Sequence, residues 1–121
     1  MSAKSVNTPF YRAGDWYIAS GITGRVGEAL VSGGFEPEFA CILKRFGEML
    51  EGQNLVRSSV AKVSIYLLDM RNRIRMNEMY IDFFAEHLPA RTVLGVNEIS
   101  RGGQVEFEAW VYSECKAAPP I

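Results

Sequence analysis

The chain has few of the histidine and cysteine residues that metal sites and disulfides need. Its 121 residues include one histidine, His87, and two cysteines, Cys41 and Cys115, whose spacing fits no CxxC motif. One imidazole and two distant thiols are too few for a histidine-rich metal site, and they leave little for a histidine-based nucleophile triad. We therefore expect reduced thiols and no bound metal.

An excess of charge and a long apolar run are also lacking. Thirteen Lys and Arg residues face fourteen Asp and Glu residues, so the formal net charge is −1. A chain with so little net charge lacks the electrostatic attraction that binds basic proteins to nucleic acid or to an anionic membrane. No apolar run approaches the roughly 20 residues of a membrane span, and the start 1–8 is polar, unlike a signal sequence. The sequence predicts a cytoplasmic protein that binds neither nucleic acid nor membrane.

What is present indicates one folded domain over residues 1–121. Hydrophobic residues make up 48% and charged residues 22%, which is typical of a globular protein of this length. Residues 1–8 and 116–121 show no periodicity, so we expect both ends to be loosely ordered.

The first half of the chain predicts a hairpin and a helix. Aromatic and β-branched residues flank Gly14-Asp15, which is typical of two strands joined by a turn over 9–21. The segment 22–32 contains glycines and scattered apolar residues, so it is interpreted as a loop leading into a weak strand. Apolar residues then recur at helical spacing from about Pro37 to Gly52.

The second half predicts a strand over 58–68, a helix from an Asp69 N-cap to about Glu86, and two further strands over 92–96 and 104–112. In the last strand, alternate residues share a face. One face is apolar and the other mixes acidic and aromatic side chains: Val105, Phe107, Ala109 and Val111 against Glu106, Glu108, Trp110 and Tyr112.

This order of elements predicts an α+β protein with a single mixed β-sheet. Each helix connects two strands, and such crossovers place both helices on one face of the sheet. The other face then stays partly uncovered. Trp110 and Tyr112 on that bare face predict self-association.

Arg91 follows Pro89, which ends the preceding helix, and stands where the strand over 92–96 begins. A planar guanidinium at such a strand end suits a carboxylate or phosphate, which it grips with two parallel hydrogen bonds. The alternative is an exposed arginine paired with a nearby Asp or Glu.

Several segments together resemble the Rid (YjgF-like, RidA) family of reactive intermediate deaminases. They run in the family's order through nearly the whole chain: Pro9-Phe10, 18–21, 60–70, 76–80, Phe83-Phe84, 89–92 and 105–109. The resemblance implies a chorismate-mutase-like protomer. It also implies a homotrimer whose sheets form a central barrel, with three clefts between adjacent subunits.

The resemblance further implies an enzyme without metal or organic cofactor that hydrolyses enamines and imines. Its substrates would be of the 2-aminoacrylate and 2-iminopropanoate type, and its products 2-keto acids and ammonia. By matching position, Arg91 would hold the substrate carboxylate and Glu106 would position the attacking water.

Five further residues match family positions that line the cleft. Phe10 matches an aromatic residue that often comes from the neighbouring subunit, although many members carry tyrosine there. Ser20 and Gly21 match the strand end beside the ligand, Asn77 a helix position in the cleft, and Val93 a source of backbone groups. Each also has a structural alternative: packing for Phe10, a satisfied hydroxyl for Ser20, a surface amide for Asn77.

Two other functions stay open at this point. The same trimer could bind a small carboxylate or 2-keto acid without turning it over, as a regulatory module. RNA cleavage, also attached to this family, is disfavoured because the chain has no basic, base-stacking surface.

Overall fold

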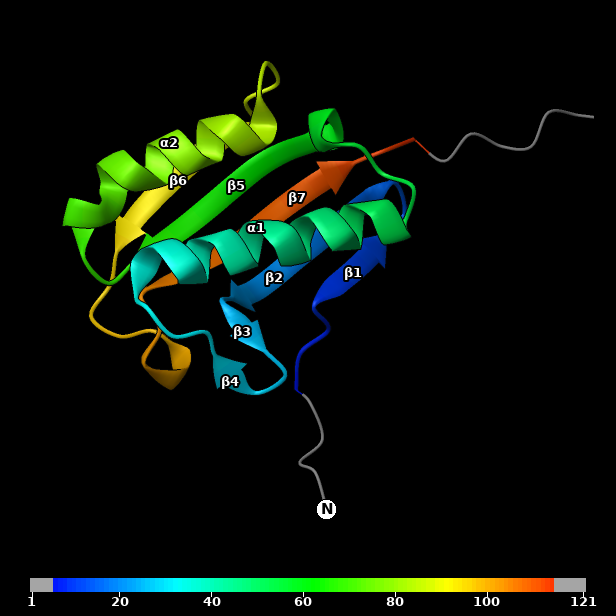
Figure 1. Ribbon diagram of the computed structural model, residues 1–121. Coiled ribbons are helices and arrows are strands. Elements are labelled where there is room, and N and C mark those ends of the chain that lie inside the picture. The colour runs from blue at the N-terminus through cyan, green and yellow to red at the C-terminus, as the bar shows by residue number, and fades with distance from the viewer. Residues whose placement is uncertain (1–5, 115–121) are drawn as a thin grey trace, which may run out of the picture.

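The computed structural model describes residues 6–114, which form a five-stranded sheet with two helices on it and a small two-stranded sheet (Figure 1). Cys115 and the tail 116–121, for which reduced state and loose order were predicted, lie outside the described residues, as do residues 1–5. The strands are β1 Phe10–Ala13, β2 Trp16–Thr23, β3 Arg25–Val26, β4 Ala29–Leu30, β5 Val60–Leu67, β6 Ala90–Gly95 and β7 Val105–Tyr112. The helices are α1 Phe35–Gly52 and α2 Arg73–Phe84, with short 3-10 turns at Arg57–Ser59, Met70–Asn72 and Ser100–Gly102.

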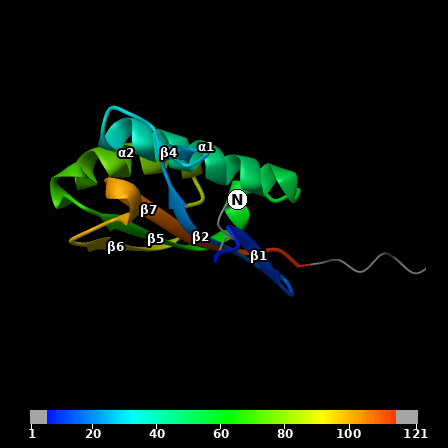
Figure 2. The ribbon, with the colours of Figure 1, turned by 90° about the horizontal axis from the view of Figure 1, so that it is seen from below.

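Five strands form the main sheet in the order β1-β2-β7-β5-β6. β5 and β6 are parallel and are joined through α2, whereas all other neighbours in this sheet are antiparallel. Both helices lie on the same side of the sheet (Figure 2). The predicted α+β architecture, with a mixed sheet covered on one face, is therefore confirmed. Within residues 6–114, no helix is long and apolar enough to cross a membrane.

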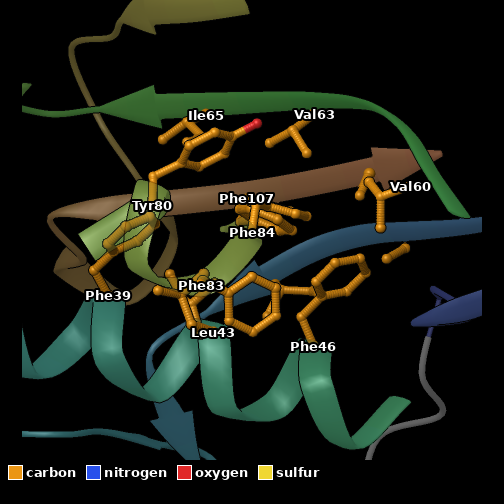
Figure 3. Close-up of a cluster of buried hydrophobic side chains, with 14 of the residues drawn as sticks. Phe39, Leu43, Phe46, Val60, Val63, Ile65, Tyr80, Phe83, Phe84 and Phe107 are labelled. Carbon is orange, nitrogen blue, oxygen red and sulfur yellow. The ribbon is translucent and has the colours of Figure 1, made fainter. Parts of the chain in front are cut away.

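The core lies between the helices and the covered face. All four apolar residues of β7 that were predicted to share a face are fully buried, whereas Glu106 on the opposite face is only half-buried. Aromatic rings fill the middle of this layer, with Phe46 of α1 and Phe107 of β7 at a centroid distance of 5.0 Å (Figure 3). Burying each such ring contributes about 1.5–3 kcal/mol.

Helix α1 begins at Phe35, so Pro37 lies in its first turn, as predicted. Proline fits this third helical position because the first N–H groups of a helix have no intrahelical acceptor. Residue Gly34 before it has φ 88°, a conformation that glycine adopts without strain. The predicted end at Gly52 is confirmed.

The second helix is shorter than predicted. Asp69 does act as a cap, accepting a hydrogen bond from the Arg71 backbone N–H at 2.9 Å, but it caps a 3-10 turn. The α-helix proper starts at Arg73 and ends at Phe84, because Ala85 takes a positive φ of 55°.

The segment 22–32 is more regular than the predicted loop and weak strand. Its first two residues extend β2, and the rest forms the small β3–β4 hairpin. A Cβ atom at Gly24 would lie 2.5 Å from the Cα atom of Glu38, so only glycine lets the hairpin pack this closely against α1.

The uncovered face of the sheet carries aromatic and polar side chains. Trp16 and Tyr112 contact each other at a centroid distance of 5.1 Å and are 41% and 40% exposed. Farther along the same face, the Tyr66 hydroxyl donates a 2.6 Å hydrogen bond to Glu108. Such a mixture of aromatic and polar side chains is more typical of a protein–protein interface than of a surface exposed only to solvent.

Candidate functional site

Arg91 lies on the edge strand β6 with its side chain over helix α2. Its partner in register on β5 is Val63, which is fully buried under the helices, so Arg91 also points to the helix side. The Nη1 group donates a 2.8 Å hydrogen bond to Oδ1 of Asn77. The guanidinium carbon lies 4.8 Å from the ring centroid of Tyr80, a cation–π distance. An amide and an aromatic face therefore orient this cation.

A hollow of about 280 Å³ opens beside this arginine. Its lining combines one cation and one amide with apolar walls: Arg91, Asn77, Tyr80, Ile81, Leu88 and Pro89. Within the described residues, no ion pair includes Arg91, so its charge is not neutralised by a carboxylate of the chain. Val93 follows on the same face of β6 and packs half-buried against the core. The hollow suits a small anion with a short apolar part.

Tyr80 supports Arg91 with its ring rather than its hydroxyl. The side chain is 3% exposed, and its hydroxyl has no hydrogen-bond partner in the described part of the chain. Burial raises the pKa of Tyr80 to about 12, although the positive charge of Arg91 acts in the opposite direction. The hydroxyl thus stays protonated at neutral pH.

Tyr80→Phe should leave the free energy of unfolding unchanged or raise it by about 1 kcal/mol, since it removes a buried group without a partner and keeps the ring. Chemical denaturation measures this. Tyr80→Leu is the matched variant that loses the ring, and it should destabilise the protein. A clear loss of stability in Tyr80→Phe would mean that the hydroxyl has a partner in the working protein.

Glu106 lies on the other face of the sheet. It is opposite Tyr66 of β5 and Thr23 of β2, and it lines a hollow of about 530 Å³. Burial, and then the negative charge of Glu108, raises the pKa of Glu106 above its ordinary value. A raised pKa makes this carboxylate a stronger proton acceptor than an ordinary glutamate.

Ser20 and Gly21 form a bulge in β2 at the edge of the same hollow. Between the pairs Ala19↔Ala109 and Ile22↔Phe107, β2 has one more residue than β7. Gly21 takes φ 69°, which a residue without Cβ adopts at little cost, and it lines the hollow with Glu106. The bulge therefore turns this strand end toward the glutamate.

Phe10 begins the other edge strand, β1. It is half-buried, and its ring centroid lies 5.5 Å from that of Tyr17. Its neighbour Pro9 accepts a 3.1 Å hydrogen bond from the Ser20 N–H and lines the hollow with Glu106. The Phe10 side chain itself packs against the core on the helix side of the sheet, so it does not line the hollow.

The predicted site residues fall into two groups within one chain. Arg91, Asn77 and Val93 gather at β6 and α2, whereas Ser20, Gly21 and Glu106 lie where β2 pairs with β7. Phe10 joins neither group, because it pairs with Ala19 on β1 and packs on the helix side of the sheet. Two strand spacings and three residues of strand separate Arg91 from Glu106, roughly 14 Å, and their side chains point to opposite faces. One chain does not bring the two groups together.

The sequence did not point to two arginines that line the hollow of Glu106. Arg25 lies in β3 and Arg101 in the 3-10 turn Ser100–Gly102, both in segments interpreted as loops or turns. No periodicity marks either residue, and their proximity depends on how the β3–β4 hairpin packs. Among residues 6–114, no group of three His, Cys, Asp or Glu side chains is placed to hold a metal.

Comparison with known proteins identifies relatives that point to one family. The family model described as endoribonuclease L-PSP matches residues 4–113. The mouse protein named 2-iminobutanoate/2-iminopropanoate deaminase is 37% identical over 93 residues, which cover 73% of this chain and 69% of the mouse protein. A RutC family protein of Pyrococcus horikoshii is 31% identical over 106 residues, which cover 85% of this chain and 83% of that protein.

A solved structure from Thermotoga maritima superimposes with a TM-score of 0.85 at 27% identity, covering 93% of this chain and 90% of the other. At this coverage, the superposition includes both the sheet and the helices of this chain. On the family match and these relatives, the chain belongs to the Rid (YjgF-like, RidA) family, as its motifs indicated.

Proposed function

We propose that this protein hydrolyses small 2-imino acids, and the enamines that equilibrate with them, to 2-keto acids and ammonia in the cytoplasm. The observation that carries the proposal is Arg91, a cation held by Asn77 and Tyr80 at an apolar-walled hollow and paired with no carboxylate of the described chain. Relatives at 31–37% identity whose names include a 2-iminobutanoate/2-iminopropanoate deaminase support the same chemistry.

In this mechanism, Arg91 binds the substrate carboxylate through two N–H donors and fixes the plane of the C=N bond. Glu106 takes a proton from water as the water oxygen bonds to C2, and it passes that proton to the imine nitrogen. The resulting carbinolamine then transfers its hydroxyl proton to the nitrogen through Glu106. The C–N bond breaks, the carbonyl forms and ammonia leaves.

The two groups of site residues require a second copy of the chain. Arg91 and Glu106 point to opposite faces, and Phe10 lies on β1 while Arg91 lies on β6, the two opposite edges of the sheet. Four strand spacings, roughly 19 Å, separate these edges. A homotrimer that closes in a ring, with bare sheet faces inward, would set the Arg91 group of one subunit against the Glu106 group of the next.

The direct test generates 2-iminopropanoate or 2-iminobutanoate in situ with an amino acid oxidase and follows its decay with and without the protein. We expect faster decay with ammonia and 2-keto acid as products. Calorimetric titration with 2-oxobutanoate covers the non-catalytic alternative. Binding of the keto acid without any faster decay of the imine would identify a binding or regulatory trimer and exclude the enzyme.

A further inference from the structure

Two cations meet at the hollow that contains Glu106. Arg25 donates from Nη1 to the carbonyl oxygen of Gly27, and Arg101 donates from Nη1 to the carbonyl oxygen of Glu28. The two acceptors are adjacent residues in the turn of the β3–β4 hairpin, which stands out from the sheet in Figure 1. Both guanidinium groups are therefore gathered at one turn, although 76 positions separate the arginines in the sequence.

The positive charge of this corner is not cancelled by ion pairs of the described residues. Neither Arg25 nor Arg101 takes part in any of the ion pairs found among residues 6–114. A third cation, Arg45, donates a 2.7 Å hydrogen bond to the carbonyl oxygen of Thr23. Burial, and then the positive charge of Arg25, lowers the pKa of Arg45. Arg45 does not line the hollow, and Glu48 acts on its pKa in the opposite direction, but the shift shows that the charge of Arg25 reaches a second cation. An anion beside Arg25 would relieve this repulsion.

Arg101 is also held in a backbone conformation that arginine rarely adopts. Its φ is 64°, and the following Gly102 has φ 73°. A non-glycine residue in this region costs of order 1 kcal/mol, and such residues concentrate where a ligand is held. In this backbone conformation, the Arg101 side chain contacts the hairpin turn and lines the hollow.

We propose that this hollow is a second anion subsite, in which Arg25 and Arg101 bind the distal carboxylate of a dicarboxylic 2-imino acid. The inference rests on the proposed imine hydrolysis for the reacting end of the ligand, which Arg91 of another subunit would hold. Glu106 lines the same hollow, so a substrate bound there passes directly beside the group that positions water. A volume of about 530 Å³ accommodates a small dicarboxylic acid.

Two acidic side chains also line the hollow, Glu28 and Glu106. Glu28 and Arg101 are both exposed, so solvent screens both charges. Glu106 acts as an ionised carboxylate in the proposed mechanism, so the lining carries no net positive charge. The preference for a ligand carboxylate therefore depends on the hydrogen-bond donors of Arg25 and Arg101, which neither acidic side chain occupies in an ion pair.

The test compares imines of aspartate and glutamate with those of alanine and 2-aminobutyrate, each generated in situ by a suitable amino acid oxidase. The wild-type protein should prefer the dicarboxylic imines in kcat/KM. Arg25→Gln and Arg101→Gln should each lower the ratio of dicarboxylic to monocarboxylic kcat/KM by about tenfold or more, since each loses a charge-assisted hydrogen bond. Arg73→Gln, an exposed arginine at the start of α2, is the matched control and should keep the wild-type ratio.

A second arm separates this inference from the proposed function. Calorimetry compares binding of 2-oxoglutarate with that of 2-oxobutanoate to the wild type and the same variants. Turnover of monocarboxylic imines without any preference for dicarboxylic ones would overturn the subsite and leave the deaminase. If no imine is turned over, preferential 2-oxoglutarate binding that depends on Arg25 and Arg101 would retain the subsite alone, and its absence would remove both.

Discussion

Arg91→Ala should lower kcat/KM for 2-iminopropanoate by about a hundredfold or more. A guanidinium that binds a carboxylate makes two charge-assisted hydrogen bonds, and each is worth about 1.5–3 kcal/mol. Alanine removes both and also the cation that fixes the plane of the substrate. The decay of the imine generated in situ measures the loss, and circular dichroism checks that the variant keeps its fold.

Arg91→Lys is the sharper variant because it keeps the positive charge. Lysine presents a point charge without the planar pair of donors, so we expect it to lose most of the activity as well. Arg73→Gln is a control for the loss of an exposed arginine elsewhere. Undiminished turnover by Arg91→Lys would show that charge alone matters and that paired hydrogen bonding is not the role of Arg91.

Glu106→Gln should lower kcat by roughly 10²–10⁴-fold, the usual contribution of a positioned acid or base. Glutamine keeps the size and polarity of the side chain but cannot accept and return a proton. The loss should appear in kcat more than in KM, because Arg91 still holds the carboxylate. A normal kcat in Glu106→Gln would exclude proton transfer by this residue.

The acid limb of the pH profile should follow Glu106 in the wild type. Water activation needs the ionised carboxylate, so activity falls as the pH drops through its pKa. Because burial and Glu108 raise that pKa, the fall should begin at a higher pH than for an ordinary glutamate. Glu106→Gln should lack this limb in its residual activity.

Mixing the two inactive variants tests whether the site is shared between chains. In the proposed homotrimer, Arg91→Ala and Glu106→Gln chains that are unfolded and refolded together should form mixed trimers, in which about a quarter of the interfaces combine two intact halves. Activity should then return to about a quarter of the wild-type value. Refolded mixtures that stay inactive would place both residues in the site of a single chain, contrary to their opposite faces.

Most of the fold followed from periodicity, and the errors have local causes. The alternation in β7 and the helical spacing of α1 predicted which side chains are buried, because a single face of each element meets the core. The boundaries of α2 depended on a 3-10 turn after Asp69 and on the positive φ of Ala85. Neither feature produces a periodic pattern of apolar residues in the sequence.

The site was less accessible to sequence reasoning than the fold. Motif resemblance proposed Arg91 and Glu106 as site residues, but the chain order gave no sign that they point to opposite faces, which depends on strand register. Arg25 and Arg101 belong to no motif and to no periodic pattern in the sequence. Their meeting at the β3–β4 turn is a product of tertiary packing.

The uncovered sheet face also bears on the fate of a newly synthesised chain. A single chain completes its core without a partner, since both helices cover one side of the sheet. On the other side, Trp16 and Tyr112 stay partly exposed, and exposed aromatic surface promotes aggregation of a newly made chain. The hydrogen-bonded Tyr66 and Glu108 add polar groups to the same face, and polar groups among exposed aromatic rings counteract aggregation.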